Sequence, residues 1–155
     1  MKNIYKLFFL SVIFFAVGSF TANAQTVTGS IGNGTFTPGK SVRATVVLSL
    51  PGGVHANSRK PGSEYAIPTT IRASAKGVRI GAVSYPRGHD RKFDFSSETI
   101  NVYEGRTAFY FNINVPANYT AKTLRVNVTV KYQACTNEVC YPPKTKEITL
   151  TARVQ

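Results

Sequence analysis

The sequence predicts an all-β protein, with one domain built as an immunoglobulin-like antiparallel β-sandwich. Three observations lead to this prediction. Apolar and polar residues alternate with a period of two along several stretches, which is typical of strands with one buried face. No long stretch beyond residue 24 has the 3.6-residue apolar period of a helix. Turn signals rich in Pro and Gly separate the alternating stretches at the short spacing expected for a sandwich.

Three long strands are expected where the alternation is clearest. In the last of them Leu124, Val126, Val128 and Val130 share one face and polar residues occupy the other. The expected long strands are 41–50, 108–116 and 123–132. Shorter strands are expected at Thr70–Ala75, Val78–Ser84, Thr99–Tyr103 and Glu147–Arg153, with one more at Thr26–Ile31. Since the chain has no Trp, the antibody-type core disulfide packed on a tryptophan is excluded.

The N-terminus is typical of a secretory signal peptide. Lys2 and Lys6 provide a basic start, Leu7–Phe20 is an apolar run of 14 residues, and Ala22-Asn23-Ala24 matches a signal peptidase site. The apolar run is shorter than the roughly 20 residues that a spanning helix needs. We therefore expect residues 1–24 to be removed and residues 25–155 to form the domain. No later segment is apolar enough to cross a membrane, so the mature protein is expected outside the cytoplasm without an integral membrane segment.

The charge balance is strongly basic. Without Lys2 and Lys6 the chain carries 17 basic and 7 acidic residues, a net charge of +10. The basic residues are scattered, and the longest adjacent clusters are Arg59-Lys60 and Arg91-Lys92. With no polybasic run and no nucleic-acid-reading motif, the sequence indicates a solvated basic surface rather than nucleic-acid binding.

The chain has two cysteines, Cys135 and Cys140, separated by four residues and followed by Pro142-Pro143. Outside the cytoplasm two cysteines this close are expected to form a disulfide. One interpretation is a structural clip at the turn of a hairpin. A six-residue loop, however, gains only about 2 kcal/mol in the loop-entropy model. The other interpretation is a redox-active pair, because an exposed disulfide is open to attack by another thiolate. The residues alone leave both interpretations open.

Few other side chains suggest chemistry. His55 and His89 are 34 positions apart and lack the spacing of a zinc finger, so no metal site is predicted. No cofactor motif and no Ser/His/Asp grouping is present, which argues against a hydrolase. Phe93 and Phe95 flank Asp94, an alternation that also fits a strand burying its aromatic residues.

Three stretches together resemble the family of the amino-terminal periplasmic domain of the thiol:disulfide interchange protein DsbD. The specific one runs from Tyr132-Gln133-Ala134-Cys135 to Cys140-Tyr141-Pro142-Pro143. The supporting stretches are Gly53-Val54-His55-Ala56-Asn57-Ser58, with Lys60-Pro61-Gly62 and Ile67-Pro68-Thr69 after it, and Val83-Ser84-Tyr85-Pro86, with Phe93-Asp94-Phe95-Ser96 and Val102-Tyr103-Glu104-Gly105 after it. Similarity of this kind covers most of residues 51–150.

The resemblance implies an immunoglobulin-like fold and thiol-disulfide exchange. By analogy Cys140 forms the mixed disulfide with partners and Cys135 resolves it. A loop around Gly88–Phe95 caps the pair, with Phe93 as the first candidate for its aromatic tip and Phe95 as the second. His55 and Asn57 take the places of two tyrosines that flank the site in the family, and Tyr141 flanks it from the cysteine motif.

The chain also departs from the family pattern. The cysteines are one residue closer, and Arg91-Lys92 replaces an acidic pair before the cap aromatic. The membrane part and the thioredoxin-like part of DsbD are not in this sequence, so the expected donor is a separate protein.

The function expected from the resemblance is a periplasmic relay of reducing equivalents. The donor would be a thioredoxin-fold or membrane-embedded disulfide reductase, and the clients would be oxidised periplasmic proteins. No cofactor is needed for such exchange. The alternative is a non-catalytic immunoglobulin-like envelope module in which the disulfide is a permanent hairpin clip.

Overall fold

The computed structural model describes residues 25–155, and the expected signal peptide at 1–24 lies outside these residues. The described part forms strands joined by turns and loops, and contains no helix that could span a membrane. The strands are β1 (Thr26–Ile31), β2 (Thr35–Phe36), β3 (Ser41–Ser49), β4 (His55–Asn57), β5 (Thr70–Ser74), β6 (Arg79–Ile80), β7 (His89–Lys92), β8 (Thr99–Glu104), β9 (Arg106–Asn114), β10 (Thr123–Tyr132), β11 (Ala134–Cys135) and β12 (Lys144–Val154).

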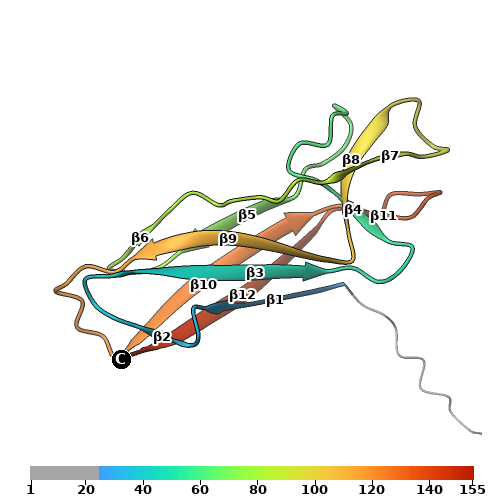
Figure 1. The fold of residues 1–155 in the computed structure, drawn as a ribbon. Helices are drawn as coiled ribbons and strands as arrows, with labels where there is room; N and C mark the ends of the chain where they lie inside the picture. The colour runs from blue at the N-terminus through green and yellow to red at the C-terminus, as the bar shows by residue number, and fades with distance from the viewer. Residues whose placement is uncertain (1–24) are drawn as a thin grey trace, which may run out of the picture.

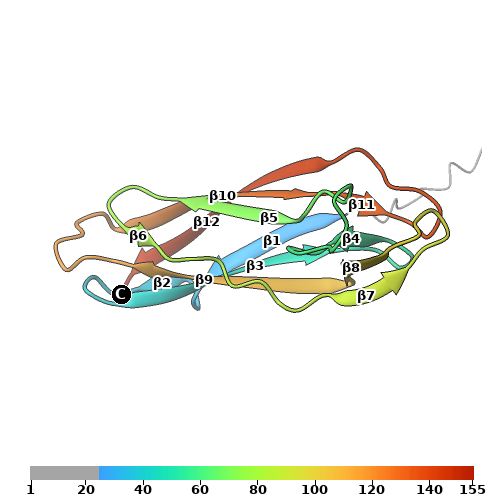
Figure 2. The same ribbon diagram turned by 90° about the horizontal axis from the view of Figure 1, so that it is seen from above.

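Two sheets form the body of the molecule. Sheet A has the order β1-β3-β9-β6 and sheet B has the order β2-β12-β10-β5. Every pairing is antiparallel except the short parallel contact of β2 with β12. The two sheets lie as layers of an elongated sandwich (Figures 1 and 2). This confirms the predicted all-β, immunoglobulin-like sandwich.

The core lies between the two sheets, where the sequence alternation placed it. Sheet A contributes Ala44, Val46 and Leu48 from β3, and sheet B contributes Val126 and Val128 from β10, all fully or almost fully buried. Burying one such side chain stabilises the fold by roughly 1.5–3 kcal/mol relative to leaving it exposed. The alternation of these strands therefore explains why their apolar faces meet.

A third sheet extends the sandwich at one end. Sheet C has the order β11-β4-β8-β7 and lies at the end opposite the C-terminus (Figure 1). The chain passes from β8 in sheet C to β9 in sheet A through Gly105 alone, whose φ of 59° is a conformation that glycine adopts without strain. Its carbonyl accepts a hydrogen bond from Leu50 N at 2.9 Å, where the chain leaves β3 for β4.

Sheet C uses its two faces differently. Ala134, Ala56 and Tyr103 point into the main core. The residues next to them in sequence, Cys135 and His55, therefore project from the opposite face. The Tyr103 hydroxyl donates to the Pro86 carbonyl and accepts from Arg59 N, at 3.2 Å each, and so ties two loops of this end together. Burial raises the pKa of Tyr103, which keeps this hydroxyl protonated.

The main differences from the sequence prediction are in short segments. The strand expected at Val78–Ser84 is reduced to β6 and an isolated bridge of Ser84 with Tyr110. Between the Ile80–Ile113 pair and the Ser84–Tyr110 bridge, the chain advances four residues on this side but only three on β9. The extra residue interrupts the ladder as a β-bulge does. We expected a loop around Gly88–Phe95, but its first half is a strand: His89–Lys92 forms β7 and pairs with β8.

The sandwich core makes a testable prediction at Phe109. This fully buried ring packs edge-on against Tyr85 and Tyr103, at centroid distances of 5.6 and 5.4 Å. We expect Phe109→Ala to lower the free energy of unfolding by about 3–5 kcal/mol, because it leaves a cavity in a packed core. Asn112→Ala, at an exposed position of the same strand, should cost less than about 0.5 kcal/mol. Urea unfolding of both variants checks this, and equal losses would contradict the assigned faces of β9.

Candidate functional site

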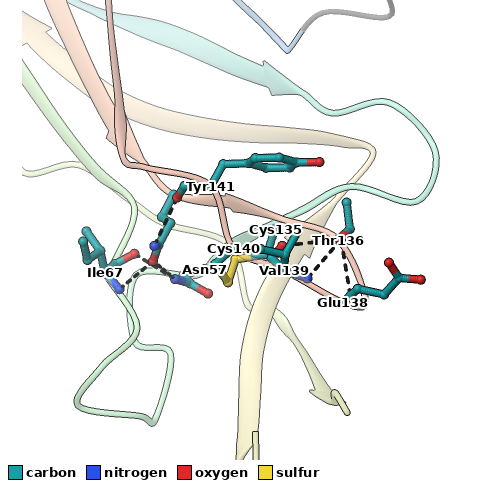
Figure 3. The surroundings of a disulfide bond; sticks show 9 residues. Asn57, Ile67, Cys135, Thr136, Glu138, Val139, Cys140 and Tyr141 are labelled. Carbon is teal, nitrogen blue, oxygen red and sulfur yellow. Dashed lines mark hydrogen bonds between the residues drawn. A yellow bond between two sulfur atoms is a disulfide. The ribbon is translucent and has the colours of Figure 1, made fainter. Parts of the chain in front are cut away.

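The disulfide of Cys135 with Cys140 lies at the tip of sheet C (Figure 3). The ladder of β10 with β12 ends where Tyr132 pairs with Lys144, so residues 133–143 leave the sandwich before the first cysteine. Cys135 instead ends β11 and pairs with His55 of β4. The disulfide therefore does not clip the β10–β12 hairpin, as the structural interpretation assumed, but closes a smaller turn beyond it.

Local hydrogen bonds build this smaller turn. Thr136 N donates to Val139 O at 2.8 Å, and the Thr136 hydroxyl accepts from the backbone N–H groups of Glu138 and Val139 (Figure 3). A threonine hydroxyl that accepts from the next N–H groups is a common way to fix a tight turn. Tyr141 N donates to Ala134 O at 2.9 Å, which places the two cysteines opposite one another as a bridge.

The two cysteines differ in their exposure. Cys135 is completely buried, whereas Cys140 is partly exposed. Cys140 lines a cavity of about 430 Å³ together with Asn57, Tyr65 and Phe95. A thiolate from another protein can therefore reach the disulfide through Cys140 but not through Cys135, and thiol exchange requires such access.

Asn57 lines this cavity and connects the neighbouring segments by hydrogen bonds. Its side chain is buried and its Nδ2 donates to Ile67 O at 3.2 Å and to Gln133 Oε1 at 3.0 Å. Gln133 Oε1 also accepts from Ile67 N, and Gln133 Nε2 donates to Tyr141 O at 3.2 Å. These bonds join residues 57 and 67 to the cysteine segment at 133 and 141. Gln133 was quoted in the sequence motif without a role; its place between two buried neighbours is the signal that could have identified it.

The structure separates the two candidate cap residues. Phe93 is only 5% exposed and packs in a small cluster with Ile100 and Val102. Phe95 is 41% exposed, stacks on Phe93 with ring centroids 5.2 Å apart, and lines the cavity that contains Cys140. Of the two candidates, Phe95 rather than Phe93 thus lines that cavity.

The other predicted flanking residues lie around the disulfide in different ways. His55 is buried beside Cys135 and stacks on Phe93 with ring centroids 4.2 Å apart. Tyr141 is exposed, and its ring points away from the sulfur atoms (Figure 3). His89 lies exposed on β7, and within residues 25–155 no cluster of three His, Cys, Asp or Glu side chains could hold a metal ion.

Burial and charge act together on His55. Burial lowers the pKa of His55, while the nearby carboxylate of Glu104 raises it and Arg91 lowers it. Arg91 and Glu104 form an ion pair at 3.5 Å. Neither residue was predicted as part of the site, because their closeness to His55 depends on the pairing of β4, β8 and β7, for which the sequence gives no local signal.

Charge is unevenly distributed over the molecule. Six of the seven acidic residues belong to the three segments at the disulfide end, 51–69, 86–105 and 133–143. These segments also carry 5 of the 17 basic residues of the described chain, which gives a net charge of −1. The remaining body then carries +11. A partner approaching the disulfide therefore meets a nearly neutral surface, not the strongly basic one that the overall composition suggests.

A family model matches most of the sequence. The family model described as "Thiol:disulfide interchange protein DsbD, N-terminal" matches residues 30–152. A thiol:disulfide interchange protein DsbD of Haemophilus ducreyi is 26% identical over 91 residues, which are 59% of this chain and 15% of that protein. The chain thus spans a small part of that curated relative.

Solved structures of similar fold include two bacterial domains. The DsbD N-terminal domain of Neisseria meningitidis, in the reduced form, gives a TM-score of 0.49 at 17% identity, covering 83% of this chain and 90% of that one. The N-terminal periplasmic domain of ScsB from Proteus mirabilis gives 0.49 at 15% identity, covering 82% of this chain and 44% of that one.

The Asn57 network predicts a specific loss of stability. Asn57→Ala removes both hydrogen bonds that Nδ2 donates and leaves the part-buried Ile67 carbonyl without this partner, so we expect the free energy of unfolding to fall by about 1–3 kcal/mol. Asn101→Ala, which removes an exposed hydrogen bond to Asp90 from the same sheet, should cost less than about 1 kcal/mol. Urea unfolding measures both, and amide exchange at Ile67 should accelerate only in Asn57→Ala. Unchanged protection of Ile67 in that variant would contradict the network.

Proposed function

The chain belongs to the family of the DsbD N-terminal domain, and on that premise we propose that it is a periplasmic thiol-disulfide exchange domain. It accepts reducing equivalents from a separate thioredoxin-fold or membrane-embedded donor and passes them to oxidised envelope proteins. The observation that carries the proposal is the asymmetric disulfide, with Cys140 reaching a surface cavity and Cys135 buried behind it. Residues 1–24 serve as the signal peptide that delivers the domain to the periplasm.

The exposure of the two sulfurs supports their separate roles. A donor thiolate attacks the sulfur of Cys140, because this cysteine is the accessible one. The bond between Cys135 and Cys140 breaks, and a mixed disulfide forms between the donor and Cys140. The second donor thiol then releases the domain with both cysteines reduced. With an oxidised client the order is reversed: Cys140 attacks, and Cys135 resolves the mixed disulfide.

Exposed apolar residues near Cys140 support docking of a partner protein. Tyr65 is 83% exposed and shares the cavity with Phe95, while Val139 and Tyr141 flank Cys140 in the chain and are also exposed. Large exposed apolar side chains gathered at one site are typical of protein interaction surfaces. The partner would bury these residues while its own cysteine reaches Cys140.

The aromatic pair at this end is suited to shield the disulfide between encounters. Phe95 covers the cavity side, and Phe93 beneath it forms a stack with His55 that holds Phe95 in place. Shielding by Phe95 is reversible at small cost, since this residue lies in the loop after β7 and is already partly exposed.

The alternative is a binding module with a structural disulfide. The β10–β12 ladder argues against it, because its ten consecutive pairs, from Thr123–Arg153 to Tyr132–Lys144, all lie outside the turn that the cysteines close. A clip beyond the end of a complete ladder adds little to the stability of the sandwich. The reduction potential distinguishes the two functions: the exchange domain should fall between about −120 and −270 mV, whereas a structural disulfide should lie below about −300 mV.

A trapping experiment tests the assigned cysteine roles. We expect Cys135→Ser to accumulate a mixed disulfide through Cys140 with a thioredoxin-fold donor whose second cysteine is replaced by Ser and whose first is supplied as a mixed disulfide with thionitrobenzoate. Cys140 displaces thionitrobenzoate from the donor sulfur, and no resolving thiol remains on either protein. Cys140→Ser should form almost none, since Cys135 is buried. Non-reducing gel electrophoresis and mass spectrometry measure the adducts. Equal trapping by the two variants would contradict the roles, and a wild-type disulfide that no unmodified, reduced thioredoxin-fold donor reduces while the fold is intact would refute the exchange function.

The shielding role predicts a faster reaction with small thiols when Phe95 is removed. Phe95→Ala should be reduced by dithiothreitol several-fold faster than the wild type, because access to the sulfur of Cys140 increases. Tyr110→Ala removes an equally exposed aromatic residue from sheet A, far from the disulfide, and serves as the matched control. If both variants react at the wild-type rate, Phe95 does not shield the pair.

A further inference from the structure

We propose that His55 is the proton acceptor for Cys135, the group that takes the thiol proton before Cys135 resolves a mixed disulfide. This inference rests on the proposed exchange function and adds a residue to its mechanism. Three independent observations support it: the position of His55 in the sheet, the unpaired state of its ring nitrogen, and the burial of Cys135.

The strand register places His55 directly beside the disulfide. Cys140 bridges to Cys135, Cys135 pairs with His55, and His55 pairs with Glu104. Residues directly opposite in antiparallel strands project from the same face, with Cβ atoms about 4.5–5.5 Å apart. These four side chains therefore form one row across sheet C, in which the imidazole is the neighbour of Cys135.

The ring of His55 has a buried nitrogen without a hydrogen-bond partner in the described part of the chain. The side chain is 2% exposed, and its Nε2 atom is buried without a hydrogen-bond partner among residues 25–155. Buried polar atoms without partners are rare in folded proteins. In the oxidised protein the neighbouring sulfurs carry no hydrogen and cannot donate to this nitrogen. Reduction creates an S–H group on Cys135, the cross-strand neighbour of His55, and so supplies a hydrogen-bond donor on this face.

Cys135 in turn needs an acceptor. The thiolate is the attacking species in exchange, and burial in apolar surroundings raises the pKa of a thiol. Solvent cannot take the proton directly, since Cys135 is completely buried. Arg91, the cation that acts on His55, is engaged with Glu104 at 3.5 Å. His55 is therefore the available base on the face that carries Cys135.

The surroundings of His55 keep it ready to accept a proton. The charged groups that face it are Glu104 from β8 and Arg91 from β7, and Cys135 faces it from β11. Burial lowers the pKa of His55 more strongly than Glu104 raises it, so the imidazole is neutral at neutral pH. The stacked ring of Phe93, at an interplanar angle of 11°, fixes the plane of the imidazole.

The resolving step can be written in full. The Sγ–H of Cys135 gives its proton to the free ring nitrogen of His55. The resulting thiolate attacks Sγ of Cys140, which is bonded to the sulfur of an oxidised client. The bond between Cys140 and the client breaks, the Cys135–Cys140 bond forms, and the client leaves as a thiolate. The proton passes from His55 to that thiolate or to water, so the client gains two electrons and the cysteine pair loses two.

The test uses the purified reduced protein and the small aromatic disulfide DTNB, which releases one coloured thiolate at each step. Cys140 attacks first, and Cys135 then resolves the mixed disulfide. We expect His55→Phe, which keeps a ring to stack on Phe93, and His55→Gln to leave the first phase nearly unchanged. Both should slow the second phase by roughly 10²-fold at pH 7, because a positioned general base typically contributes about 10²–10⁴-fold.

The pH profile separates proton transfer from a packing effect. In the wild type the second phase should level off above the titration of the coupled His55–Cys135 pair. In both variants it should keep rising with pH, as expected for an unassisted thiol. His89→Gln, at the exposed histidine of β7, should behave as the wild type. Wild-type rates with a wild-type pH profile in both His55 variants would overturn the proposal.

A second measurement does not depend on the variants folding. In wild-type protein, NMR titration of the His55 ring should change between the oxidised and reduced states, with a step coupled to ionisation of Cys135 in the reduced state. Identical titration in both states would overturn the proposal. Failure of the exchange function itself has a different signature: the coupling would be present, but no thioredoxin-fold donor would reduce the disulfide.

Discussion

The antiparallel ladder of β10 with β12 is the constraint on which the placement of the disulfide depends. Because it closes at Tyr132 and Lys144, the chain between them must leave the sandwich and find its hydrogen bonds elsewhere. It finds them on β4, and β4 finds its second partner in β8. Sheet C therefore exists because buried backbone groups require partners. The disulfide, the cavity and His55 all take their positions from that pairing.

The sequence was sufficient to predict the parts of the fold that repeat a pattern over many residues. β10 was predicted with its observed bounds, since five apolar residues alternate along it. Strands β4 and β7 were not predicted. β4 is three residues long and buried throughout, and β7 is exposed throughout, so neither has an alternation to detect. Strands this short form because they pair with strands distant in the sequence, and a short stretch of sequence does not contain that information.

The candidate site shows the same division. The cysteines, His55 and Asn57 could be identified through their resemblance to a family motif. The unequal burial of the two sulfurs, the exposure of Phe95 above Phe93, and the ion pair of Arg91 with Glu104 could not, because each depends on contacts between segments far apart in the chain. Composition was misleading for the electrostatics, since the sandwich body carries a net charge of +11 while the end that carries the disulfide has a net charge of −1.

The two-sided arrangement of sheet C has a consequence for variation of the protein. Positions 56, 103 and 134 face the core, while 55, 104 and 135 face the disulfide. Neighbouring positions along one strand are thus under different constraints: one must pack in the core, and the next determines the surroundings of the disulfide. Mutation can change the surroundings of the disulfide without touching the residues that keep the chain folded. Such independence lets one scaffold vary its disulfide site in steps that each preserve a folded protein.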